Sequence, residues 1–301
     1  MIKSITVTNY LDETIVLDMR HPEKSGFLIK KIDGLGPVKA DINITEVATG
    51  DGARYNSARA TSRNIVMKLG LMFTPSVEDV RQKSYKYFPL KKKVKLVIET
   101  DNRICETYGY VESNEPDIFS KSETTTISII CPDSYLYSTE KSITVFYGVE
   151  PAFEFEFSNE SLTENMIEFG VIEDNAIQTI YYEGDAEVGV DIHIHALGEV
   201  TNLSIWNVKT RESMRIDSSK LEQLTGSGIV NGDDIIITTD KDNKTVQLLR
   251  NGTYTNILNC LDRNANWFKL SKGDNIFTYK ASYGTTNVQL RIENSVVYEG
   301  V

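Results

Sequence analysis

The sequence predicts a mainly β protein of two domains. Apolar and polar residues alternate along many short segments, the pattern of strands that bury one face. Turn-forming residues recur between these segments, and one segment alone has convincing helical spacing. With 301 residues, 40% hydrophobic and 25% charged, the chain is long enough for two ordinary globular cores. We place the domain boundary after residue 140, which gives an N-terminal domain over 1–140 and a C-terminal domain over 141–301.

The N-terminal domain begins with strands. Residues 2–9 and 14–18 alternate as a half-buried hairpin would, and residues 26–32 form a third strand. Two longer strands, 38–47 and 64–73, then flank a polar stretch with small residues. This arrangement predicts a projecting β-arm, such as those that serve contacts between subunits, with a long surface loop as the alternative.

The expected helix lies between Ser76 and Pro89. Ser76 can cap the first turn, and the following acidic residues favour the positive end of the helix dipole. Val80 and Ser84 share one face at helical spacing, and Pro89 ends the helix. The pattern therefore predicts one short helix in this domain.

The remaining strands complete both domains. Residues 96–100 and 106–111 predict a hairpin, and 125–131 predict the last strand of the first domain. Strict alternation at 153–157, followed by short strands at near-even spacing, predicts a C-terminal antiparallel β-sandwich. These further strands are 179–182, 188–196, 201–207, 211–216, 235–239, 244–250, 275–279 and 287–293. Residues 219–224 are expected to form at most one helical turn.

Charge and cysteine content exclude several classes of function. The net charge of −11 disfavours a protein that reads nucleic acid by sequence, because an acidic surface repels phosphates. The three cysteines are far apart and form no CxxC pair, so we expect no zinc site. No window approaches the roughly 20 apolar residues of a membrane-spanning helix.

No pattern in the sequence predicts catalysis. A GxSxG elbow, a Walker A loop and a GxGxxG loop are all absent. His193 and His195 share one strand face, as metal ligands would, but the third histidine of the chain, His21, lies in the other domain. We therefore expect an exposed strand face there, and no catalytic residue, cofactor or metal.

Two tryptophans and a pair of aspartates are further candidates in the second domain. Trp206 and Trp267 predict core packing of the sandwich, and the alternative is a platform for stacking sugars. Asp233 and Asp234 lie beside a turn and are expected to be solvated.

Ordered blocks along the chain resemble one known family. The blocks KYFPLKKKVKL, ETDNR, GYVE, EPDIFSK and ISIICPDSYLYS follow one another between residues 86 and 138. GLGPVKADINITEVATGDG precedes them, and GDAEVGVDIHIHALGEVTN follows in a looser second half. In this order they resemble the distal tail protein (Dit, siphophage tail component) of long-tailed phages and prophages.

The resemblance implies a fold and an assembly. It implies an N-terminal β-barrel-like domain with one short helix and a C-terminal galectin-like antiparallel β-sandwich. Six copies would form a ring at the virion tail tip, after assembly in the bacterial host cytoplasm. This homo-hexamer would join the tail tube protein to tail-tip proteins, a tail-associated lysin or the baseplate, and DNA would pass through it. No galectin sugar-binding motif is present, and the family offers no catalytic residue.

We expect subunit contacts at the arm over residues 50–63 and at the helix over residues 81–88. The candidate contact residues are Asp51, Arg54, Tyr55, Arg63, Arg81 and Tyr85. The alternative function is a carbohydrate-binding or glycan-cleaving tail accessory that acts through the C-terminal sandwich, with Trp206 and Trp267 as its platform.

Overall fold

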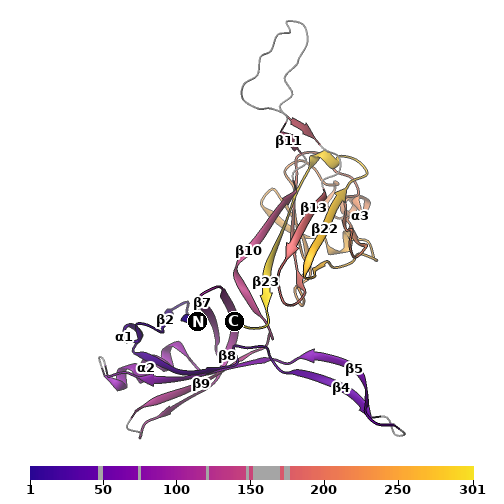
Figure 1. The fold of residues 1–301 in the computed structure, drawn as a ribbon. Helices are drawn as coiled ribbons and strands as arrows, with labels where there is room; N and C mark the ends of the chain where they lie inside the picture. The colour runs from indigo at the N-terminus through magenta and orange to yellow at the C-terminus, as the bar shows by residue number, and fades with distance from the viewer. Residues whose placement is uncertain (47–49, 74–75, 120–121, 147–148, 152–169, 173–176) are drawn as a thin grey trace, which may run out of the picture. The chain divides into compact units, whose positions relative to one another are not determined.

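The computed structural model describes residues 1–46, 50–73, 76–119, 122–146, 149–151, 170–172 and 177–301 (Figure 1). They form two compact units, unit 1 with Met1–Glu140 and Val297–Val301, and unit 2 with Lys141–Val296. The strand expected at 153–157 lies outside the described residues. The predicted fold class is confirmed, because both units consist mainly of antiparallel strands. No helix among the described residues combines the length and the apolar character that a membrane crossing needs.

Unit 1 is built on one curved antiparallel sheet. Its strand order is β2-β1-β7-β8-β9-β6-β3. The bounds are β1 Ile2–Thr8, β2 Thr14–Asp18, β3 Phe27–Asp33, β6 Arg63–Leu71, β7 Lys93–Thr100, β8 Ile104–Asp117 and β9 Thr124–Cys131. The two end strands, β2 and β3, follow each other in sequence and are in contact, so the sheet curls into the barrel-like form that we expected. The hairpin predicted around residues 101–103 is present as β7 and β8.

The core of unit 1 fills the inside of this sheet. Alternate residues such as Ile5, Leu96 and Ile129 point inward and are at most 1% exposed, as the period of two requires. Helix α2 (Val77–Tyr87) closes the core with Val80, and Phe88, the C-cap residue after the helix, packs into the same core. As predicted, its N-cap is Ser76, whose hydroxyl accepts a hydrogen bond from the Asp79 amide at 3.1 Å.

One short helix of unit 1 was not predicted. Helix α1 (Pro22–Ser25) has four residues and ends at Gly26, whose φ of 85° lies in the left-handed region. A single turn leaves too few residues for a helical period to show in the sequence, and Pro22 and Gly26 were its only local signals.

The arm is present, but the strands expected to form it were partly wrong. Strand β4 (Ala40–Glu46) pairs with β5 (Ala53–Ala60) as a separate two-stranded sheet. The sequence placed the second arm strand at 64–73, but those residues form β6, which pairs with β3 and β9. The reason is burial, because Ile65, Met67 and Leu69 of β6 are at most 1% exposed and belong to the core.

Unit 2 is a two-layer β-sandwich. One sheet has the order β23-β15-β18-β19-β20 and the other β13-β22-β16-β17. Their bounds are β13 Ile177–Tyr182, β15 Asp191–Ala196, β16 Ser204–Asn207, β17 Glu212–Arg215, β18 Asp234–Thr238, β19 Thr245–Arg250, β20 Thr253–Asn256, β22 Gly273–Lys280 and β23 Val288–Tyr298. Alternate residues of both sheets, such as Ile192, Ile237 and Phe277, are completely buried between them. Short strand pairs, β11 (Val149–Pro151) with β12 (Gly170–Ile172) and β14 (Val188–Gly189) with β21 (Lys269–Leu270), complete the unit.

Two details differ from the sequence analysis. Helix α3 (Ser218–Thr225) has eight residues rather than one turn, because Asp217 caps its first amides and Gly226 ends it at a φ of 85°. The chain enters unit 2 within β10 (Leu136–Phe146), and its last five residues lie with unit 1 rather than with the second domain. There the Val301 amide donates to the Leu35 carbonyl at 3.1 Å.

Candidate subunit interface

The β4–β5 arm has one apolar and one polar face. Opposite residues in an antiparallel pair point to the same side, so the register assigns the paired side chains, and its hydrogen bond to Thr45 assigns Asn56, which lies at a bulge. The apolar arm face consists of Ala40, Ile42, Ile44, Ala53, Tyr55, Ala58 and Ala60, with Glu46 at its end. The polar face carries Asp41, Asn43, Thr45, Arg54, Asn56, Ser57 and Arg59. Hydrogen bonds from Asn56 to Thr45 at 2.7 Å and from Arg59 to Asp41 at 3.0 Å confirm the polar face.

The apolar arm face is uncovered within unit 1. Every residue of β4 and β5 is exposed, and the exposed fractions are 58% for Ile42, 55% for Ile44 and 62% for Tyr55. A two-stranded hairpin by itself is at best marginally stable in water, and a contiguous apolar strip on a surface commonly marks a contact with another molecule. The arm therefore has the properties of a surface that another chain covers.

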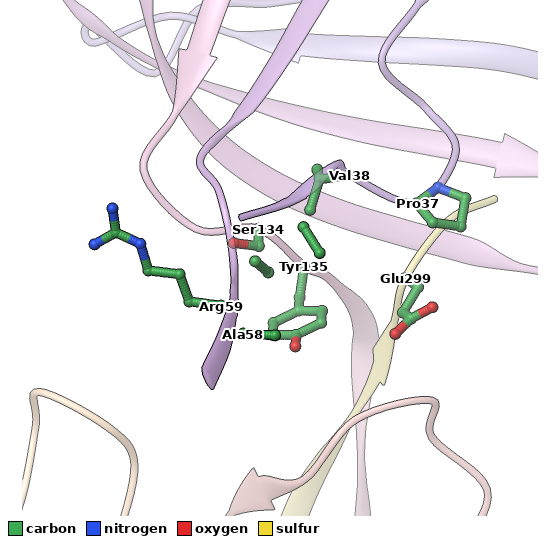
Figure 2. A pocket seen from close by; sticks show the side chains of 9 residues that line it. Pro37, Val38, Ala58, Arg59, Ser134, Tyr135 and Glu299 are labelled. Atoms are coloured by element: carbon green, nitrogen blue, oxygen red, sulfur yellow. The ribbon is translucent and has the colours of Figure 1, made fainter. Parts of the chain in front are cut away.

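A small pocket lies where this face meets the barrel (Figure 2). Its volume is about 240 Å³, and we call it the root pocket. The root pocket is lined by Pro37, Val38, Ala40, Ala58, Arg59, Ala60, Ser134, Tyr135 and Glu299. Figure 2 shows the Tyr135 ring lying between Ala58 and Glu299, while the guanidinium of Arg59 points away. Ala40, Ala58 and Ala60 belong to both features, so the apolar arm face runs into the root pocket.

Arg63 was expected to be a subunit contact, but its buried side chain instead holds the root of the arm. Its side chain is completely buried, and its five N–H groups donate to backbone carbonyls at 2.6 to 3.1 Å. The acceptors are the carbonyls of Gly34, Gly36, Ser134 and Glu299. Burial lowers the pKa of the Arg63 guanidinium. Three distant segments therefore meet at Arg63, and no local sequence signal could have shown this.

The other expected contact residues fall into two separate groups. Asp51, Arg54 and Tyr55 are exposed on the arm or at its tip. Arg81 and Tyr85 lie on α2, which Figure 1 shows on another side of unit 1 from the arm. Tyr85 is exposed, whereas the Arg81 side chain is only 16% exposed and lies 3.0 Å from a Glu78 carboxylate oxygen.

Ile42, Ile44 and Tyr135 belong to this surface but were not among the predicted contact residues. The alternation of Ala40, Ile42 and Ile44 was the available signal for an apolar face. Nothing local linked Tyr135 to the arm, because the two lie together only in the folded chain.

The two histidines of β15 each have a carboxylate partner. His195 Nδ1 lies 2.7 Å from Asp234 Oδ1, and His193 Nε2 lies 3.6 Å from Glu293 Oε1. Both line a groove of about 670 Å³ on this sheet, together with Arg291 and other residues of β18 and β23. Among the residues that the structure describes, no three His, Cys, Asp or Glu side chains are placed to hold a metal ion.

The two tryptophans and Asp233 of unit 2 lie apart from the root pocket and the groove, whereas Asp234 lines the groove. Trp206 on β16 and Trp267 are both half-buried, and the Lys244 ammonium lies 5.3 Å from the Trp267 ring centre. Neither tryptophan lines the root pocket or the groove. The expectation that Asp233 is solvated was wrong: its carboxylate is buried and binds Arg250 at 2.6 and 2.7 Å.

Comparison with known proteins assigns part of the chain to a family. Residues 183–293 match the family model of the siphovirus-type tail component, C-terminal domain. No curated protein matches the chain. All the matched residues lie in unit 2.

Two solved structures resemble the chain over nearly its whole length. The SPP1 Dit (gp 19.1) protein, a hub adsorption apparatus of phages that infect Gram-positive bacteria, aligns with a TM-score of 0.67 and 10% identity over 98% of this chain and 99% of that chain. A chain of the phage P2 baseplate, in its activated conformation with Ca, aligns with a TM-score of 0.50 and 14% identity over 98% of both chains. With the family model, this fold confirms the resemblance to the distal tail protein family.

Proposed function

We propose that this protein is a distal tail hub, whose copies join through the β4–β5 arm into a closed ring. The proposal rests on the apolar arm face, because its apolar side chains lie together on one side of the hairpin and unit 1 leaves them exposed to water. The family match of residues 183–293 and the likeness to SPP1 Dit, itself a hub, support it. As the resemblance implies, six copies would join the tail tube protein to tail-tip, lysin or baseplate proteins.

The arm suits a contact that repeats around a rotation axis. An arm that docks on a different surface of the next copy makes a head-to-tail contact, and repetition of such a contact gives a ring when the rotation between copies closes. The net charge of −11 is compatible with a lumen through which DNA moves, because an acidic surface does not retain phosphates. The protein would act at the virion tail tip without a catalytic step, after assembly in the host cytoplasm.

The test is the mass of the purified protein by light scattering, with negative-stain images of the same fraction. We expect a ring of six copies. The double variant Ile42→Asp/Ile44→Asp places two charges on the apolar arm face and should give monomers whose thermal unfolding is unchanged. The matched control Asn43→Asp/Thr45→Asp places the same charges on the polar face of the same strand and should keep the ring. A ring that persists in the first variant would contradict the role of the arm.

The alternative, a glycan-binding or glycan-cleaving accessory, has weaker support. Its proposed platform, Trp206 and Trp267, lines neither pocket. A glycan array and a turnover assay on cell-wall fragments separate the two functions, and the hub predicts no signal in either assay.

A further inference from the structure

We infer that Tyr55 at the arm of one copy seats in the root pocket of the next copy. This inference rests on the proposed ring and names the contact that forms it. It follows from the size of the root pocket, from the position of Tyr55 and from the distance between the two on one chain.

The root pocket has the size of a side-chain site. Its volume of about 240 Å³ is below the roughly 300–1,000 Å³ typical of small-molecule sites. Its walls are mostly apolar and include the half-buried ring of Tyr135. Interfaces between proteins are commonly anchored by one aromatic side chain in such a pocket. A tyrosine would also meet Tyr135 ring to ring, an arrangement that adds to the stabilisation from burial alone.

Tyr55 is the aromatic residue of the apolar arm face. It lies opposite Ile44 on the half of the arm away from the barrel, and 62% of its surface is exposed.

The chain cannot fill its own root pocket. Ala40 lines the pocket and lies four residues from Ile44, the partner of Tyr55. At about 3.3 Å per residue, Tyr55 and Ala40 are roughly 13 Å apart along one flat arm. Tyr55 therefore reaches a root pocket only on a second copy. Each copy has one Tyr55 and one root pocket, so the contact can repeat from copy to copy. A contact between the Tyr55 side chains of two copies would instead end at a dimer.

Disulfide cross-linking of the full chain tests the contact. The natural cysteines Cys105, Cys131 and Cys260 are buried, and burial raises the pKa of each thiol, so they compete little for oxidant. A disulfide needs Cα atoms within about 7 Å, so Tyr55→Cys and Ala40→Cys cannot join within one chain. The double variant should give a ladder of covalent oligomers up to the ring size, and a mixture of the two single variants should give dimers. Each single variant by itself should stay uncross-linked.

The outcomes separate this contact from the proposed function. A double variant that keeps the mass of the ring without cross-linking would overturn the tip-to-root contact and leave the hub intact. Cross-linking of Tyr55→Cys to itself would also overturn it, in favour of paired tips. A wild-type protein without a ring would instead remove the proposed function.

A pocket-filling variant gives a second, independent measurement. Ala58→Trp should occupy the root pocket and abolish the ring, while Ser57→Trp on the polar face should keep it. Both residues are exposed in unit 1, so we expect the same thermal unfolding for both variants. A ring of unchanged mass in Ala58→Trp would contradict the inference.

Discussion

Two hairpins with the same alternating pattern have opposite environments. In β18–β19 of unit 2, Ile237 and Leu248 are at most 1% exposed, because the facing sheet of the sandwich covers them. In β4–β5 of unit 1, Ile42 and Ile44 are more than half exposed. Alternation therefore shows that a strand has a face to bury. It does not show whether the same chain or another copy covers that face.

The largest expected effect separates the two hairpins directly. Ile237→Ala leaves a cavity in the sandwich and should lower the free energy of unfolding of unit 2 by about 2–5 kcal/mol. Ile42→Ala should change unfolding by less than about 0.5 kcal/mol but weaken the ring, because its side chain is buried only on association. Both tryptophans lie in unit 2, so tryptophan fluorescence during denaturation follows Ile237→Ala, and far-ultraviolet circular dichroism, which also reports on the strands of unit 1, follows Ile42→Ala. A strong loss of stability in Ile42→Ala would show that the arm already packs within its own chain.

The second effect concerns the residue that joins the arm to the barrel. Arg63→Met removes the buried donors of four backbone carbonyls and should destabilise unit 1 by roughly 3 kcal/mol. The control is Arg59→Met, four residues earlier, whose exposed ion pair with Asp41 should contribute less than about 1 kcal/mol. Circular dichroism melting compares them. Equal melting temperatures would mean that water replaces the lost donors.

A smaller effect is expected at the glycines whose carbonyls bind Arg63. Gly34 has a φ of 87°, and a Cβ there would lie 1.9 Å from the Asn64 carbonyl oxygen, so Gly34→Ala should cost roughly 2 kcal/mol. Gly36 has open space at the same position, and Gly36→Ala should be neutral within about 1 kcal/mol. Chemical denaturation of both variants measures the difference between their free energies of unfolding. Equal values would show that the backbone at the root of the arm rearranges to accept the added methyl group.

The smallest effect depends on pH and belongs to unit 2. Burial, and then the charge of Asp191, raises the pKa of Asp240, so the native state binds its proton more tightly than the unfolded chain does. Asp240 contributes its full stabilisation at pH values below the pKa that its carboxyl has in the unfolded chain. This contribution is lost as the pH rises through the higher pKa of the carboxyl in the native state. Asp240→Asn should therefore stabilise unit 2 at pH 7, and its advantage should disappear near pH 4.

The measurement for Asp240→Asn is the melting temperature at several pH values. The control is Asp242→Asn, exposed in the same turn, which should show no comparable pH dependence. An advantage of Asp240→Asn that grows as the pH falls would reverse the sign and contradict the argument.

Local chemistry in the sequence determined much of this protein. The alternation of apolar residues predicted the mainly β class, and the two strand patterns at 96–100 and 106–111 predicted the β7–β8 hairpin. Ser76 marked the start of α2 through its own cap. The ordered blocks identified the family resemblance. The alternation and the helix cap act between residues that are close in the chain, and the order of the blocks is a property of the sequence itself, so all of them can be read without the fold.

Only the tertiary structure decided the rest. It paired β4 with β5 rather than with the more apolar β6, which the barrel core takes up. It buried Arg63 and Asp233, whose partners come from distant segments. It also brought Tyr135 to the arm and made the root pocket. A charged or polar residue is buried only where remote groups satisfy its hydrogen bonds, and such partners meet only when the chain has folded.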